Sequence, residues 1–363
     1  MKTNFTTLAL AGLAVALAGC SKSNEPVGGT EPTDITVRIV APSTYASGPT
    51  AVGLTPDIYD ATLYFLGSSG SILAVGTMSQ AEVTSGKTFN DIPGDAAEIL
   101  FVGNAAALSS PNLPNVLRVE ESTLTSTTFW EQAVQTNPKT GVNVIGEGTI
   151  MGSAGNRTAT VTALPAVSRI EIAQVEANPA ATIPLTSFKL TGIYINNAYA
   201  ELGLDYTTLP AAGDILNYGS DDPIWNTGYP PTFCELMPGA TAGTTFNPGA
   251  GNVWSFFALP VVAGNGTIID GAVQTSVPHI ILKIEEATAN GFTLPDPAYL
   301  TIKDFKRGAT DITSLIKGKV FSISTIAFGG EHLTAKPEIS TKENVAVTVT
   351  VTPWTNDPVT PDL

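Results

Sequence analysis

The chain has 363 residues, of which 43% are hydrophobic and only 13% are charged, and its formal net charge is −15 at pH 7. This acidic balance excludes a nucleic-acid-binding protein, because that binding depends on Lys and Arg side chains at the phosphates. The length allows two domains of about 100–200 residues each. Cys20 and Cys234 are the two cysteines, and lipidation of the first would leave no pair for an internal disulfide.

Residues 1–19 are typical of a lipoprotein signal peptide. Lys2 gives a positive start, and the apolar run 7–18 is shorter than the about 20 residues needed to span a bilayer. The run ends in Leu17-Ala18-Gly19-Cys20, which resembles a lipobox. We therefore expect a covalent lipid on the Cys20 thiol and no other cofactor, with each buried CH₂ of the acyl chains contributing about 0.8 kcal/mol. An ordinary signal peptide with a chance cysteine is the alternative.

Residues 20–33 are polar and rich in Gly, Pro and Glu, which predicts a flexible tether. Beyond them, many segments alternate apolar and polar residues with period two, as in Arg169-Ile170-Glu171-Ile172, and this pattern predicts strands with one face in a core. The expected strands are 35–40, 58–66, 72–75, 99–103, 158–164, 167–173, 188–196, 253–262, 277–285, 299–305, 320–328 and 345–352. No long helical crossovers separate them, so the sequence favours antiparallel β-sandwiches.

The pattern predicts two tandem domains with few short helices. A boundary near Pro165 gives an N-terminal β-sandwich domain at 34–165 and a C-terminal β-sandwich domain at 166–363. One helix is expected at Thr128-Phe129-Trp130-Glu131, which resembles a capping box. The stretches 178–184 and 210–250 are expected to be loops.

No arrangement of side chains predicts catalysis or metal binding. His279 lies in an apolar strand and is expected to be structural, and Cys234 is expected to be a small core residue. Met151-Gly152-Ser153-Ala154-Gly155 lacks the first glycine of a nucleophile elbow, which favours a turn. Asp221-Asp222 could hold a hard cation, but a solvated acidic turn is the simpler interpretation. We therefore expect neither an enzyme nor a metal protein.

The tryptophans are dispersed along the chain. Packing in the core or at its rim is expected for each of them, and a sugar-stacking platform is the alternative. They are Trp130, Trp225, Trp254 and Trp354.

The C-terminal region has the most regular alternation. Val345, Val347, Val349 and Val351 alternate with Ala or Thr, and Pro353 and Trp354 follow. This pattern predicts a terminal strand at 345–352 with one strongly apolar face. From periodicity alone, an ordinary last strand in the chain's own sheet is the simplest interpretation.

Taken in order, these features resemble the fimbrillins of Bacteroidales, the type V pilins. The resemblance covers nearly the whole chain, from the lipobox and tether to the final Val-x-Val-x-Val-Thr-Pro-Trp segment. Three internal segments add to it: residues 58–65, Phe101-Val102-Gly103-Asn104-Ala105, and Ser168-Arg169-Ile170-Glu171-Ile172. The resemblance implies two tandem antiparallel Greek-key (transthyretin-like) β-sandwich domains.

The resemblance also implies how such a chain would mature and assemble. After export as a lipoprotein, the N-terminal segment would be removed by cleavage after an arginine, and a strand from a neighbouring subunit would fill the groove left behind. Arg38 is the better candidate for this cleavage, because a cut at Arg118 would split the first domain. The candidate donor strand is 345–352, with Trp354 beside it.

The sequence therefore predicts a structural fimbrial (pilus) subunit that supports adhesion. Its expected partners are other fimbrial subunits and, before maturation, the outer membrane through its lipid, and its expected location is the cell outer membrane and the surface fimbrium. The sequence does not separate a stalk subunit from a tip or an anchor. The alternative is a surface glycan-binding lipoprotein with tandem β-sandwich domains.

Overall fold

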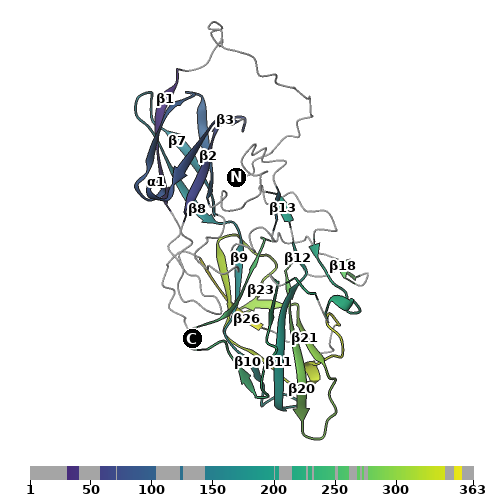
Figure 1. The fold of residues 1–363 in the computed structure, drawn as a ribbon. Helices are drawn as coiled ribbons and strands as arrows, with labels where there is room; N and C mark the ends of the chain where they lie inside the picture. The colour runs from purple at the N-terminus through teal and green to yellow at the C-terminus, as the bar shows by residue number, and fades with distance from the viewer. Residues whose placement is uncertain are drawn as a thin grey trace.

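The computed structural model describes residues 31–40, 58–70, 72–103, 123–125, 144–199, 201–203, 215–225, 228–230, 233–249, 252–260, 268–269, 272–273, 277–339 and 347–353. Within them, the chain is almost wholly β-strand, with one short α-helix and two 3-10 turns. The all-β prediction is therefore confirmed. Two groups of strands lie end to end (Figure 1). No helix in this part of the chain is long and apolar enough to cross a membrane.

The first group forms one seven-stranded sheet in the order β3-β2-β5-β7-β8-β1-β4. Its strands are β1 (Thr33–Val40), β2 (Asp60–Gly67), β3 (Ile72–Ser79), β4 (Lys87–Ile92), β5 (Ala96–Gly103), β7 (Val144–Met151) and β8 (Arg157–Pro165). The sheet curls until its two edge strands approach one another. The Lys87 ammonium donates to the Thr77 carbonyl at 2.8 Å, and the rings of Phe65 and Phe89 pack 5.2 Å apart.

The helix α1 (Gln80–Ser85) connects the two edge strands β3 and β4. Ser79 precedes its first residue, and the Glu82 carboxylate accepts hydrogen bonds from the Ser79 N–H and hydroxyl at 2.8 and 3.0 Å. Val83 is its buried residue, and Gly86 ends it with a positive φ of 84°. This helix was not predicted from the sequence, although Ser79 and Glu82 have capping-box spacing. The helix expected at 128–131 lies outside the described residues.

The second group contains two main sheets. The longer one has the order β17-β9-β24-β26-β22-β23, and the other has the order β15-β11-β20-β21. A three-stranded sheet has the order β16-β10-β25. Its strands β10 and β25 come directly after β9 and β24 in the chain. The strands are β9 (Ser168–Ile172), β10 (Val175–Ala177), β11 (Leu185–Asn196), β15 (Cys234–Leu236), β16 (Thr245–Phe246), β17 (Trp254–Ala258), β20 (His279–Ala289), β21 (Ala298–Ile302), β22 (Phe305–Arg307), β23 (Thr310–Asp311), β24 (Lys319–Ile323), β25 (Ile326–Phe328) and β26 (Val347–Pro353).

Short elements fill the remaining described parts of the chain. They are the strand pairs β6 (Thr123–Thr125) with β13 (Glu201–Gly203), β12 (Ala198–Tyr199) with β14 (Ile215–Leu216), and β18 (Ile268–Ile269) with β19 (Ala272–Val273), and the 3-10 helices η2 (Pro223–Trp225) and η4 (Gly330–His332). The stretch 210–250, expected to be a loop, holds β14, η2, β15 and β16. That expectation was wrong for these four segments. The partners of β15 and β16 are β11 and β10, about 40 and 70 residues away in sequence, so local composition does not reveal these two strands.

Each group of strands encloses an apolar core. In the first group, alternate residues such as Leu63 and Phe65 face the inside of the curled sheet. The run Ile99-Leu100-Phe101-Val102 on β5 is buried on both faces. Ile99 and Phe101 belong to the first core, whereas Leu100 and Val102 join the core of the second group. The two cores are therefore in contact through β5.

Candidate functional site

The strand β1 occupies an interior position in the first sheet, although it is the first described strand of the chain. It runs parallel to β8, from the pair Ile35 and Arg157 to the pair Val40 and Thr162. On its other side it runs antiparallel to β4, from Thr33 to Val37. Removing β1 would therefore open a slot between two strands that do not pair with each other.

The side chains of β1 complete the first core. Ile35 and Val37 are fully buried, and Ile39 packs against the same core. Burial of the first two side chains contributes roughly 3–6 kcal/mol gross. The Arg157 guanidinium holds the start of the strand, because it donates to the Thr33 hydroxyl at 3.4 Å and to the carbonyls of Gly94 and Ala96.

Arg38 lies in β1 with its side chain exposed. Its backbone is opposite Thr160 of β8, but the pairing with β4 ends one residue earlier, at Val37. The strand therefore has one neighbour at Arg38 instead of two. A protease that binds an extended peptide would have to detach only this end of the strand from β8.

The candidate donor segment lies in its own subunit in this structure. From Val349 to Pro353, β26 pairs antiparallel with β24, and at Val347 and Thr348 it pairs parallel with β22. The register places Val349 opposite Ile323 and Val351 opposite Phe321. This is the position of an ordinary strand in its own sheet, and donation to a neighbour stays a prediction. Cys20, Arg118, Val345 and Trp354 lie outside the described residues.

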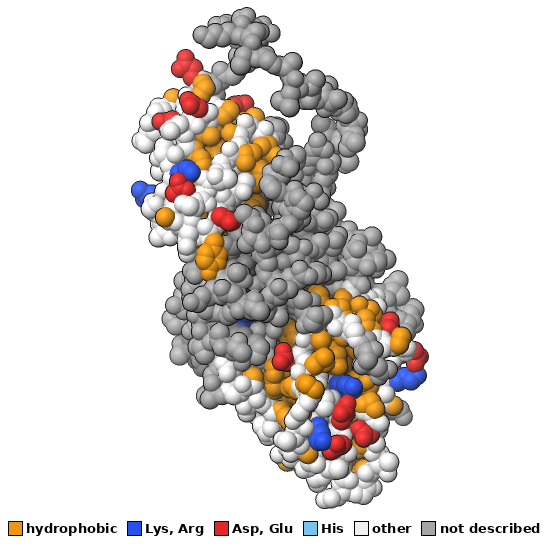
Figure 2. All heavy atoms as spheres, viewed as in Figure 1, with side chains coloured by type: hydrophobic (Ala, Val, Ile, Leu, Met, Phe, Trp, Pro, Cys, Tyr) orange, Lys and Arg blue, Asp and Glu red, His pale blue; other side chains and the backbone are white. Residues whose placement is uncertain are grey.

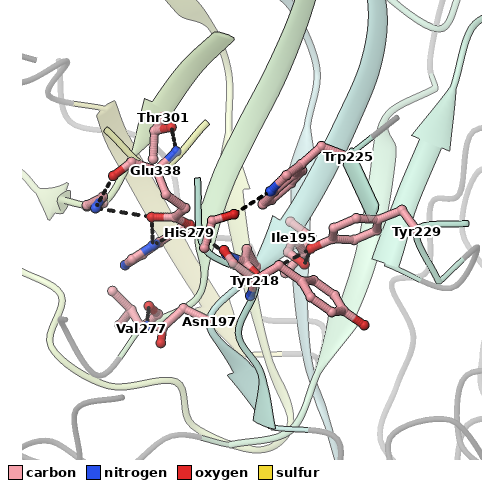
Figure 3. A network of polar contacts seen from close by, with 12 residues as sticks. Ile195, Asn197, Tyr218, Trp225, Tyr229, Val277, His279, Thr301 and Glu338 are labelled. Carbon is pink, nitrogen blue, oxygen red and sulfur yellow. Dashed lines mark hydrogen bonds and ion pairs between the residues drawn. The ribbon is translucent and has the colours of Figure 1, made fainter. Parts of the chain in front are cut away.

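A buried polar network occupies the second group of strands (Figure 3). His279, at the start of β20, is fully buried, and its Nδ1 lies 2.9 Å from both carboxylate oxygens of Glu338. Asn196, at the end of β11, donates to the same carboxylate at 2.8 Å. The sequence predicted a structural role for His279 but gave no indication of Glu338, because Lys336-Pro337-Glu338 has no periodic pattern and matches no motif.

Aromatic rings cluster beside this network (Figure 3). Trp225 and Tyr229 pack with ring centroids 5.1 Å apart, and Tyr194 lies 4.9 Å from Tyr229. Trp225 and Tyr229 are only 3% and 7% exposed, and Trp254 is also buried. Packing is confirmed for Trp225 and Trp254, and these rings form no exposed stacking platform. Trp130 and Trp354 lie outside the described residues.

A pocket of about 480 Å³ adjoins the aromatic cluster over β11 and β20. Its charged side chains already pair with neighbours, since Lys189 lies 2.6 Å from Glu286 and Lys283 lies 3.3 Å from Glu285. Figure 2 shows acidic and basic side chains intermixed over this end of the molecule. The pocket therefore offers no concentration of one charge to a ligand.

The remaining chemical candidates have structural positions. Cys234 is buried, and burial together with the Glu235 charge raises the pKa of its thiol to about 11. Asp222 accepts the Ile224 N–H at 3.0 Å, and Asp221 pairs with Lys336. Met151 ends β7, and residues 152–156 form the turn between β7 and β8, as expected. The described residues contain no group of three or more His, Cys, Asp or Glu that could hold a metal ion.

Solved structures share this fold along most of the chain. A "putative cell adhesion protein" from Bacteroides eggerthii DSM 20697 is 17% identical, with a TM-score of 0.56 over 91% of this chain and 98% of its own. One from Parabacteroides distasonis ATCC 8503 is 14% identical, with a TM-score of 0.54 over 89% and 100%. A fimbrilin from Porphyromonas gingivalis W83 is 16% identical, with a TM-score of 0.55 over 90% and 99%. No protein-family model and no curated sequence matches the chain.

Proposed function

We propose that this chain is a structural subunit of a surface fimbrium, that it is exported as a lipoprotein through Cys20, and that it has no enzymatic activity. The observation that carries the proposal is the interior position of β1 between β8 and β4. A strand near the N-terminus that completes a core can be removed and replaced by another chain. The fold shared with a fimbrilin and with cell adhesion proteins supports this role.

In the proposed assembly, a strand from a neighbouring subunit enters the slot of β1. The apolar positions of β1 are Ile35, Val37 and Ile39, and β26 offers Val347, Val349 and Val351 with the same spacing. Each strand lies between one parallel and one antiparallel neighbour: β8 and β4 for β1, and β22 and β24 for β26. A strand with the β26 pattern therefore suits the slot in the spacing of its apolar side chains, and it already pairs with one parallel and one antiparallel strand.

Such an exchange is nearly balanced in free energy. A departing β26 loses its ladder with β24 and β22 and recovers a similar ladder in the neighbour, at about 0.5–1.5 kcal/mol per net hydrogen bond. The imbalance comes from the mature subunit, because a slot emptied by proteolysis exposes the core and two unpaired strand edges. We infer that cleavage at Arg38 provides this driving force.

The test is to express the chain in its native host and examine its surface fibres. We expect electron microscopy to show fibres that contain this chain, and mass spectrometry to find a mature N-terminus at Ile39. Arg38→Lys keeps the charge on an exposed side chain but removes an arginine-specific site. This variant should fold normally, keep a lipid-bearing Cys20, and form no fibres.

The matched control is Arg307→Lys, at an exposed arginine of β22, which should assemble normally. Fibres built from chains that still begin at Cys20 would refute cleavage. A monomeric wild-type chain on the cell surface would refute the fimbrial role.

A further inference from the structure

Glu338 is held by side chains from three separate parts of the second group of strands (Figure 3). Its carboxylate lies 2.9 Å from His279 Nδ1, 2.8 Å from Asn196 Nδ2 and 3.1 Å from the Lys303 ammonium. His279 begins β20, Asn196 ends β11, and Lys303 follows β21. We refer to these four residues as the Glu338 clasp.

The clasp is largely buried and contains charged side chains. The side chains of Glu338 and His279 are 0% exposed, and that of Lys303 is 17% exposed. A buried carboxylate is costly unless it is paired and hydrogen-bonded. Burial raises the pKa of Glu338, but the hydrogen bonds and charge contributed by His279, Asn196 and Lys303 outweigh that effect and lower it overall. Glu338 is thus held as a carboxylate, and extracting it would leave an uncompensated charge.

The clasp also fixes the backbone. Glu338 has a positive φ of 60°, which non-glycine residues rarely adopt without support. Its N–H donates to the Thr301 hydroxyl at 3.0 Å, and its carbonyl accepts from the Lys303 ammonium at 3.1 Å. The main chain at Glu338 is therefore held on both sides of the residue.

In the chain, the clasp residue Glu338 is followed by the terminal strand β26. Glu338 precedes β26 by nine residues, and the contacts described for β26 are its ladders with β24 and β22. We propose that the Glu338 clasp fixes the root of β26, which is the point nine residues before this strand, so that β26 can leave its sheet while Glu338 stays in the second group of strands. This inference rests on the proposed strand exchange.

A fixed root limits how far the donor strand can reach. Nine residue steps separate Glu338 from Val347, and a fully extended chain spans at most about 3.3–3.6 Å per residue, so this link cannot exceed roughly 30–32 Å. In a fibre, the clasp of one subunit must lie within that distance of the first donor residue in its neighbour. The clasp would thereby set an upper limit on the spacing between subunits.

The test uses hydrogen exchange of the full-length monomer and electron microscopy of the mature fibres. Glu338→Gln keeps the shape of the side chain but removes its charge. We expect amide exchange at 334–338 and in β26 to rise at least about tenfold, while β11 and β20 change little. Fibres of the variant should show a broader distribution of axial repeats than wild-type fibres.

The matched control is Glu331→Gln in the same C-terminal stretch. Its carboxylate accepts hydrogen bonds from the N–H groups of Thr182 and Ile183 at 2.8 and 2.9 Å. Amide hydrogen exchange should therefore rise at these two residues and not in β26. If Glu338→Gln fails to fold, Lys303→Met should give the same pattern at smaller amplitude.

Unchanged hydrogen exchange in β26, or an equal rise across β11 and β20, would contradict the proposed role of the clasp. An unchanged distribution of axial repeats in the fibres would contradict it as well. A wild-type chain that never polymerises would instead refute the proposed strand exchange between subunits. The hydrogen-exchange experiment on the monomer would still decide whether Glu338 holds the root of β26.

Discussion

At the scale of single residues, Glu82 shows how local hydrogen bonding fixes a connection between strands. Its carboxylate accepts the Ser79 N–H and hydroxyl, and it lies 3.0 Å from the Lys87 ammonium. The hydrogen bond from the Ser79 backbone, followed by that from Lys87, lowers the pKa of Glu82 to about 2 from its usual 4.5. The ionised form therefore stabilises the turn from α1 into β4.

The sign of the resulting pH dependence follows from the lowered pKa. Glu82 contributes its full stabilisation above about pH 4.5, and the contribution is lost as the pH falls through about 2. An NMR titration of the carboxyl group should give a midpoint near 2, and Lys87→Met should move that midpoint upward. A midpoint near 4.5 in the unmodified chain would contradict these contacts.

Glycines decide how closely β7 approaches β8. A Cβ on Gly146 would lie 2.7 Å from the Thr162 carbonyl oxygen, and one on Gly148 would lie 2.7 Å from that of Thr160. These distances are shorter than real Cβ contacts, so glycine is required at both positions. The same glycines interrupt the apolar alternation of Val144–Met151, which explains why β7 was not predicted from the sequence.

At the scale of the element, β26 must fit its own sheet and also the slot proposed in a neighbouring subunit. Its register places Val349 opposite Ile323, which is 1% exposed, whereas Thr348 is opposite Lys306, which is exposed. Residues that face each other across paired strands share a face of the sheet. The register therefore pairs the valines of β26 with buried residues of its neighbours and Thr348 with an exposed one.

Val349→Asp should lower the free energy of unfolding of the monomer by several kcal/mol and abolish fibres, because a charge at this position must be desolvated. Thr348→Asp should change stability by about 0.5 kcal/mol or less, because surface substitutions have small effects. Thermal melting of each monomer beside fibre counts would measure both. Loss of fibres from Val349→Asp with an unchanged melting temperature would show that β26 contributes nothing to its own sheet.

At the scale of the whole molecule, β5 joins the two cores. Ile99 and Leu100 are neighbours on opposite faces of β5, and both are buried. Ile99 packs in the first core, whereas Leu100 packs with the core that contains Val167 and Ile170 of the second group. The unfolding of the two groups should therefore be coupled.

Truncation on the two faces of β5 tests this coupling. Leu100→Ala and Ile99→Ala should each cost about 2–5 kcal/mol. Leu100→Ala should raise hydrogen exchange in both groups of strands, while Ile99→Ala should raise it mainly in the first. If Leu100→Ala raised hydrogen exchange in only one group of strands, or if both variants gave the same exchange pattern, the bridging role of Leu100 would be wrong.

Whether a strand could be predicted from the sequence depends on how far apart in the chain its interacting residues lie. Period-two alternation located β1, β8, β9 and β11, because alternation of apolar and polar residues is a local pattern in a strand with one face in a core. The buried positions of Cys234 and Trp225 were likewise expected from their apolar character. The strand β4 was missed because Lys87-Thr88-Phe89-Asn90-Asp91-Ile92 has little alternation, and its pairing with β1 joins residues about fifty positions apart.

The sequence by itself determined the all-β class and the alternating C-terminal segment, since each is written in adjacent residues, and the lipobox at Cys20 stays a prediction from the sequence. Only the tertiary structure decided that β1 lies between β8 and β4, that β26 lies between β22 and β24, and that Glu338 meets His279. Ile35 is paired with Arg157, 122 residues away, and His279 with Glu338, 59 residues away. Such pairings depend on how the whole chain closes its cores, which no local pattern of residues encodes.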